Sequence, residues 1–182
     1  MRRSAFVSRI ALDQTTDMFM KSTLIAAFFA FALPVAALAA DMQLPADAPV
    51  ATVTIPDSWN PTEIDHGVEA VSADDAVYLS IEVANEKTTD KMIEDIFAFL
   101  EENGVKIDLA TQSEADDKLN GMDVSTIEWE GEDEDGPVSV GVTMLSPKPG
   151  KLLLMTYWGS KGDQEKHLND FVGIIASIKP VK

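Results

Sequence analysis

The chain has no cysteine among its 182 residues. It can therefore form no disulfide and has no lipobox cysteine to acylate. Its two histidines, His66 and His167, are about a hundred residues apart, so they lack the close spacing of a histidine metal motif. The glycine-rich loops that bind phosphate are also missing from the sequence. These absences argue against a nucleotide-dependent enzyme or a histidine metal site, and we expect no cofactor.

Positive charge is scarce as well. The sequence has 14 Lys and Arg residues against 31 Asp and Glu residues, a formal net charge of −17. Such a surface repels nucleic acid and anionic lipid headgroups, and it favours cationic partners. We therefore expect no nucleic-acid binding, and a partner that is either an unidentified protein or a small ligand.

One apolar run, residues 23–35, follows Lys21 and precedes Ala37-Leu38-Ala39. A positive charge, an apolar core and an A-x-A motif in this order are typical of a cleavable export signal, with cleavage here after Ala39 or Ala40. An uncleaved membrane anchor is the alternative, but a spanning helix needs about 20 apolar residues. We expect a soluble periplasmic protein with no stable membrane insertion after signal cleavage.

This export signal divides the chain into three parts. Residues 1–39 are the predicted signal segment, and a start at Met18 or Met20 would place the apolar run nearer the N-terminus. Residues 40–49 are rich in Ala, Pro and Asp without periodicity, which predicts a flexible leader. Residues 50–182 are predicted to form a single domain.

Within that domain, hydrophobic periodicity predicts three strands, a helix, four strands and a final helix. The helices are expected from Lys91 to Glu102 and from about Asp163 onward, and Asn120-Gly121 is expected as a tight turn. Residues 152–158 are apolar on both faces, which predicts a central strand covered on both sides. Because the links are short, we expect an α+β fold with a mostly antiparallel sheet of six or seven strands flanked by two main helices.

Several segments together resemble the PsbP-like superfamily, which includes many exported bacterial domains. The segments that carry the resemblance are Ile55-Pro56-Asp57-Ser58-Trp59, Asn103-Gly104, Asn120-Gly121, residues 152–160 and residues 174–180. The resemblance implies an α/β/α sandwich and a role in binding or assembly, without enzymatic residues. Photosynthetic members dock through basic patches, and this acidic chain departs from them, so a photosystem role is not carried over.

Four residues are candidates for ligand or partner binding. Trp59 lies in a loop flanked by prolines, and loops often carry function, so we expect it to be exposed and dispensable for folding. Asp65 and His66 precede a strand, and Trp158 ends the apolar strand. A Ser-His-Asp site built on His66 would need a nucleophile turn, and the chain has no G-x-S-x-G pattern. We therefore assign no catalytic residue.

The densest run of charge, residues 130–136, contains the weak metal candidates Asp133 and Asp135. These two residues align with positions three and five of a Ca²⁺-binding EF-hand loop, but Gly131 and Val142 occupy positions one and twelve, where acidic ligands are required. The run is better interpreted as a solvated hairpin turn, and we expect no metal site.

Taken together, these features favour a non-enzymatic binding or accessory protein of the periplasm. A periplasmic hydrolase using His66 and neighbouring carboxylates is one alternative, and an envelope-assembly factor is another. A pocket that gathers His66, Trp59 and acidic groups would favour an enzyme, because catalysis needs convergent polar groups in a cleft.

Overall fold

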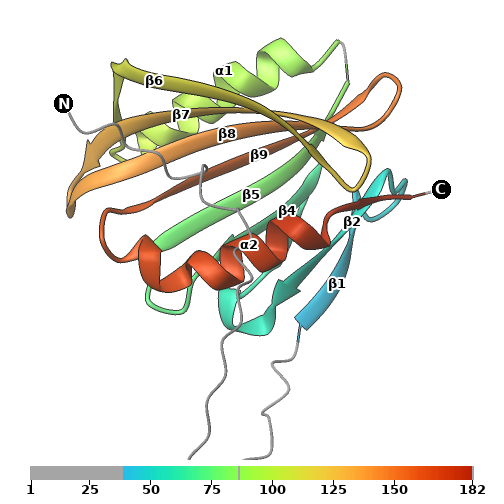
Figure 1. Ribbon diagram of the computed structural model, residues 1–182, viewed down its shortest axis with the longest axis horizontal. Helices are drawn as coiled ribbons and strands as arrows, with labels where there is room; N and C mark the ends of the chain where they lie inside the picture. The colour runs from blue at the N-terminus through green and yellow to red at the C-terminus, as the bar shows by residue number, and fades with distance from the viewer. Residues whose placement is uncertain (1–38, 86, 182) are drawn as a thin grey trace, which may run out of the picture. The chain divides into compact units, whose positions relative to one another are not determined.

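The computed structural model describes residues 39–85 and 87–181 (Figure 1). Residues 1–38 lie outside the described ranges. They include all of the predicted signal segment except Ala39, and both alternative start positions, Met18 and Met20. Within the described ranges the chain is α+β and mostly antiparallel, as the sequence predicts. No helix in this part of the chain combines the length and the hydropathy needed to cross a membrane.

The main sheet has seven antiparallel strands in the order β3-β4-β5-β9-β8-β7-β6. Their bounds are β3 Thr62–Ile64, β4 Gly67–Val71, β5 Val77–Ala84, β6 Lys106–Leu119, β7 Met122–Asp133, β8 Gly136–Lys148 and β9 Lys151–Ser160. A second sheet, not predicted from the sequence, has the order β1-β2-β10. Its strands are β1 Ala39–Leu44, β2 Ala51–Pro56 and β10 Lys179–Pro180.

Two α-helices cover opposite faces of the main sheet (Figure 1). Helix α1 (Thr89–Glu102) contains the predicted helical segment. Helix α2 (Leu168–Ser177) follows a short 3-10 turn, Gln164–His167, and begins later than the sequence predicts. Another 3-10 turn, Asp57–Trp59, connects β2 to the main sheet.

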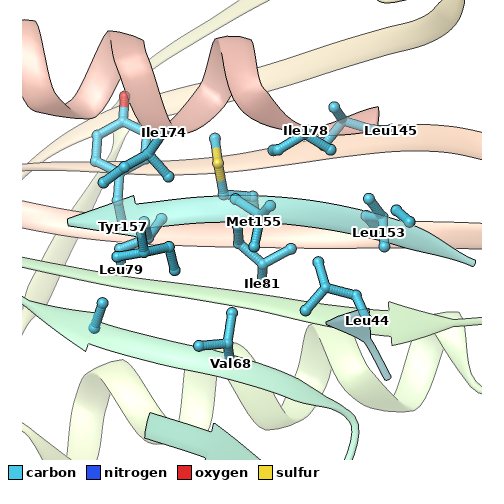
Figure 2. Close-up of a cluster of buried hydrophobic side chains, with 14 of the residues drawn as sticks. Leu44, Val68, Leu79, Ile81, Leu145, Leu153, Met155, Tyr157, Ile174 and Ile178 are labelled. Carbon is cyan, nitrogen blue, oxygen red and sulfur yellow. The ribbon is translucent and has the colours of Figure 1, made fainter. Parts of the chain in front are cut away.

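Strand β9 separates the two hydrophobic cores and confirms the prediction of a central strand. Leu153, Met155 and Tyr157 belong to the core on the α2 side, whereas Leu154 belongs to the core on the α1 side. Figure 2 shows side chains of β9, β5 and β4 meeting those of α2 in the first of these cores. A strand that is covered on both faces must be apolar at nearly every position.

Local turn chemistry explains the long meander from β6 to β9. Asn120 and Gly121 both have positive φ, 49° and 84°, and they join the paired residues Leu119 and Met122. This left-handed conformation suits the twist of a two-residue hairpin, and Asn-Gly adopts it readily. The predicted tight turn is therefore confirmed.

Strand β1 occupies the segment for which the sequence predicts a flexible leader. It pairs with β2 from Ala39↔Pro56 to Leu44↔Ala51, and the Leu44 side chain is fully buried. Met42 and Leu44 alternate with Asp41 and Gln43, but this alternation is short and ends at Pro45. Backbone pairing with β2 and the burial of Leu44 hold the segment in place. Ordered structure therefore begins before Val50.

The two ends of the described chain meet on strand β2. Lys179 of β10 pairs with Thr52, and the Thr54 backbone N–H donates to Ser177 Oγ at 2.8 Å. The Asn120 side-chain amide donates to the carbonyl of Ile178 at 2.7 Å. The C-terminal segment is thus attached both to the second sheet and to the β6–β7 turn.

Candidate functional site

A row of polar side chains crosses three strands on the α1 face of the main sheet. Glu69 of β4 stands opposite Ser80 of β5, and Ser80 stands opposite Thr156 of β9. Side chains alternate between the faces of a strand, so Tyr78 and Glu82 lie on the same face as Ser80. The apolar residues between them supply the core on the other face.

This row forms the floor of a pocket with a volume of about 270 Å³. Helix α1 contributes one wall, which consists of Met92, Asp95, Ile96 and Phe99. The end of β3 and the β3–β4 turn contribute Ile64 and His66, and the strands contribute Glu69, Tyr78, Ser80, Glu82 and Thr156. The pocket therefore combines apolar side chains from α1 and β3 with several convergent polar groups. Small-molecule sites also combine apolar surface with convergent polar groups.

Thr156 presents an unusual group to this pocket. Its side chain is 1% exposed, and its Oγ1 has no hydrogen-bond partner within the described ranges. Buried polar atoms in proteins are nearly always paired, because an unmade hydrogen bond carries the full cost of desolvation. The hydroxyl is therefore free to donate to a bound molecule or to accept from one.

Negative charge collects around the same pocket. Burial raises the pKa of Glu82, the nearby carboxylates of Asp95 and Glu69 raise it further, and His66 opposes this effect. Burial also raises the pKa of Tyr78 to about 12, with a further contribution from Glu69. The Tyr78 hydroxyl donates a long hydrogen bond to Glu69 Oε2 at 3.4 Å. The electrostatics of the site thus disfavour added negative charge.

Two aromatic rings hold Tyr78 in place beside the pocket. Tyr78 stacks on Trp158 with ring centroids 4.2 Å apart, and Phe99 of α1 contacts both rings at 5.4 and 5.7 Å. Offset and edge-on arrangements of this kind are favourable for aromatic pairs. Trp158 is half-buried and adjoins the site through Tyr78.

We expect Glu82→Gln to stabilise the folded protein at pH 7. The pKa of Glu82 is raised in the folded state, so folding favours its neutral form and stability falls as pH rises through that pKa. Glutamine cannot ionise, so the variant avoids the free-energy cost of a charged carboxylate at this partly buried position. Urea unfolding at pH 7 should show a higher midpoint than wild type, and the difference should shrink below about pH 4, where a normal glutamate is protonated in both states.

The matched control for this prediction is Glu132→Gln, because Glu132 is exposed on β7 and loses the same charge. A Glu82→Gln midpoint equal to or below that of this control at pH 7 would contradict the prediction.

The structure brings some of the predicted site residues together and separates others. His66 is exposed and lines the pocket, whereas Asp65, exposed in the same turn, is not among its lining residues. Trp59 lies in the core on the α2 side, with 1% of its surface exposed. The prediction of an exposed Trp59 is wrong.

Two contacts explain the burial of Trp59. Its Nε1–H donates to Asp170 Oδ2 at 3.4 Å, and its ring lies edge-on to His167, with centroids 5.9 Å apart. The 3-10 turn Asp57–Trp59 directs the indole into the core that contains Phe171 of α2. The flanking prolines indicated a loop but gave no information on burial.

The weak metal candidates Asp133 and Asp135 lie at the β7–β8 turn. Asp133 Oδ1 accepts the backbone N–H groups of Asp135 at 3.0 Å and Gly136 at 3.1 Å. The Asp133 carboxylate therefore stabilises the turn, and the hairpin interpretation is confirmed. Residues 39–85 and 87–181 hold no group of three or more His, Asp or Glu side chains arranged for a metal ion.

His167 forms a second polar cluster, on the α2 side. Its Nε2 lies 2.8 Å from Asp74 Oδ1, and the Ser72 hydroxyl donates to the same oxygen at 2.9 Å. These contacts lower the pKa of Asp74 to about 2. The carboxylate lies between the serine and the histidine, whereas a nucleophilic serine must contact its histidine directly. The cluster is therefore a structural link between the β4–β5 turn and the final helix.

Of the residues that line the pocket, the sequence singled out His66 alone, and the polar residues that it missed are Glu69, Tyr78, Ser80, Glu82, Asp95 and Thr156. The available signal was the polar alternation of Tyr78, Ser80 and Glu82 along one strand. That pattern is equally consistent with a face open to solvent, because alternation identifies a face but not what covers it.

No protein-family model and no curated protein matches this chain. It is similar to a solved structure from Bacteroides thetaiotaomicron, with 12% identity over 78% of this chain and a TM-score of 0.49. The chain spans about half of that protein, 47% of its length.

Two other similar structures match over most of their own length. LpqN, described as involved in cell envelope biogenesis of Mycobacterium tuberculosis, is 10% identical over 80% of this chain and 91% of its own, with a TM-score of 0.49. A cyanobacterial PsbP from Synechocystis is 12% identical over 72% of this chain and 86% of its own, also with a TM-score of 0.49. The similar structures thus include a member of the superfamily that the sequence resembles, but likenesses this weak say nothing about activity.

Proposed function

We propose that the protein is a soluble, non-enzymatic binding protein of the periplasm, with a PsbP-like fold, that takes a small ligand in the pocket between α1 and strands β4, β5 and β9. The observation that carries this proposal is the unpartnered Thr156 hydroxyl in the floor of a pocket that combines apolar side chains with other polar groups. A ligand pocket typically needs a few fixed polar groups for orientation and apolar walls for affinity.

The geometry of the pocket fits binding better than hydrolysis. A nucleophile requires a base within hydrogen-bond reach. In the part of the chain that the structure describes, Thr156 Oγ1 has no hydrogen-bond partner, so His66 makes no hydrogen bond to it. One observation favours the hydrolase alternative: His66 and Glu82 line the same pocket. Turnover of a substrate by wild type that is abolished in His66→Ala would favour it. An envelope-assembly role would instead require a protein partner.

A retention experiment tests the binding proposal. Purified protein would be mixed with the small-molecule fraction of a periplasmic extract, desalted and examined by native mass spectrometry. We expect a bound molecule on wild type that is lost from Ser80→Leu, because Ser80 is 4% exposed and the leucine would fill the pocket floor. Ser113→Leu, the same change at an exposed position of β6, should retain it.

Two outcomes of this experiment would contradict the proposal. One is that wild type retains no small molecule. The other is that Ser80→Leu retains as much as Ser113→Leu, which would place the bound molecule outside the pocket.

The periplasmic location is supported by the export signal of the sequence and has its own test. Intact-mass measurement of the periplasmic fraction should show a chain that begins at Ala40 or Asp41, as signal-peptide cleavage after Ala39 or Ala40 requires. Recovery of the full-length chain from the cytosol alone would refute this location.

A further inference from the structure

The pocket has more negative charge than its surroundings balance. Glu69, Glu82 and Asp95 all line it. Asp95 pairs with Lys91 at 2.6 Å, but within residues 39–85 and 87–181 neither Glu69 nor Glu82 takes part in a salt bridge. Both glutamates are half-buried. Partly desolvated carboxylates without a cationic partner cost free energy, and a cation placed between them would recover it.

The opposite wall of the pocket has a different chemistry. On α1, Met92 and Ile96 present apolar surface beside Asp95, and Phe99 adds an aromatic ring that is 36% exposed. Ile64, at the end of β3, adds a further apolar side chain. A bare metal ion would gain nothing from this wall, because metal ions take polar ligands. A molecule that carries both a positive group and an apolar body would contact both sides.

The hydroxyl groups on the pocket floor fit such a molecule. An ammonium group has three hydrogen-bond donors and no acceptor. Thr156 Oγ1 is buried and unpartnered, and it lies one strand away from Ser80, which adjoins Glu69 in register. Carboxylate and hydroxyl oxygens can therefore receive the donors of one ammonium group, while Tyr78 and Phe99 offer aromatic surface to the positive charge.

We propose that the ligand of this pocket is a small organic amine, protonated at neutral pH and carrying a compact apolar or aromatic body. The proposal rests on the binding function proposed above and specifies the class of ligand. The volume of about 270 Å³ lies just below the range of about 300–1,000 Å³ typical of drug-sized sites, which suits a body of one ring. The raised pKa of Glu82 supports the proposal, because a bound cation would stabilise the ionised carboxylate.

Three probes of matched shape test the charge preference. Benzylamine, benzyl alcohol and benzoate share one ring and differ in charge, and each would be titrated into ¹⁵N-labelled protein at pH 7. We expect benzylamine to shift the amide signals of Ser80, Glu82 and Thr156, and to bind at least about tenfold more tightly than benzyl alcohol. Benzoate should bind most weakly.

Variants then test which carboxylates provide the preference. Glu82→Gln and Glu69→Gln should each weaken benzylamine binding severalfold and leave benzyl alcohol unchanged. Glu132→Gln removes the same charge from an exposed position outside the pocket lining and should change neither affinity. Equal losses in all three variants would show a general effect of net charge and overturn the assignment to this pocket.

The remaining outcomes separate this inference from the proposed function. Equal affinity for the three probes, with shifts confined to the pocket, would overturn the amine class but leave a binding pocket. No shift at the pocket with any probe would also overturn the amine class, and the retention experiment with Ser80→Leu would still decide the binding function independently.

Discussion

Trp59→Ala should lower the free energy of unfolding by about 3–5 kcal/mol, the usual cost of truncating a buried tryptophan or phenylalanine. Trp59 is 1% exposed and belongs to the core on the α2 side. The substitution would leave a cavity beneath the final helix and leave Asp170 without its indole partner. Because domains are stable by only about 5–15 kcal/mol, the loss should be obvious in denaturant melts.

Phe171→Ala is the matched comparison, since Phe171 lies in the same core and is 8% exposed. The two variants should unfold at similar denaturant concentrations, and Trp59→Phe should restore most of the loss. A Trp59→Ala variant that lost less than about 1 kcal/mol would mean that the indole is not a core residue.

Gly67→Ala should cost about 3 kcal/mol, at the upper end of the range for overpacked sites. A Cβ atom added at Gly67 would lie 1.8 Å from the carbonyl oxygen of Ile81. That oxygen belongs to the backbone of β5 and cannot rotate away. Gly67 pairs with Glu82, so the β4–β5 ladder would have to separate beside the pocket. Thermal and urea unfolding would measure the loss.

Gly173→Ala provides the control for this prediction. Gly173 is exposed in α2, and nothing lies within 4 Å of its added Cβ. Alanine is better than glycine in a helix by about 0.8–1.0 kcal/mol, so this variant should be more stable than wild type. Similar destabilisation of both variants would contradict the close contact at Gly67.

The parts of the fold that depend on residues close together in the sequence could be predicted. The Asn120-Gly121 turn and the apolar strand at 152–158 are specified by residues within a few positions of one another. Strand β1 and Trp59 could not be predicted in this way. Trp59 owes its buried position partly to a hydrogen bond with Asp170, 111 residues further along the chain. The residues between Pro56 and Pro61 do not predict that contact.

The candidate site was predictable only in part, for the same reason. His66 was a candidate because it lies beside Asp65, directly before a predicted strand. Glu82 and Thr156 lie on strands whose polar faces could equally have met solvent. Only the placement of α1 over that end of the sheet turns these residues into a pocket wall. Whether such a strand face meets solvent or lines a pocket depends on which distant part of the chain packs over it.

Strand β2 pairs with segments near both ends of the described residues, and this pairing affects the timing of folding. The Thr54 backbone is bonded to Ser177, 123 residues later, and β10 completes the second sheet. Contacts so distant in sequence form late, because their loop-closure entropy must be overcome first. The core on the α2 side therefore cannot close until the segment that contains Phe171, Ile174 and Ile178 has been synthesised. A chain that crosses a membrane in an extended state would reach the translocation channel before its own fold could prevent passage.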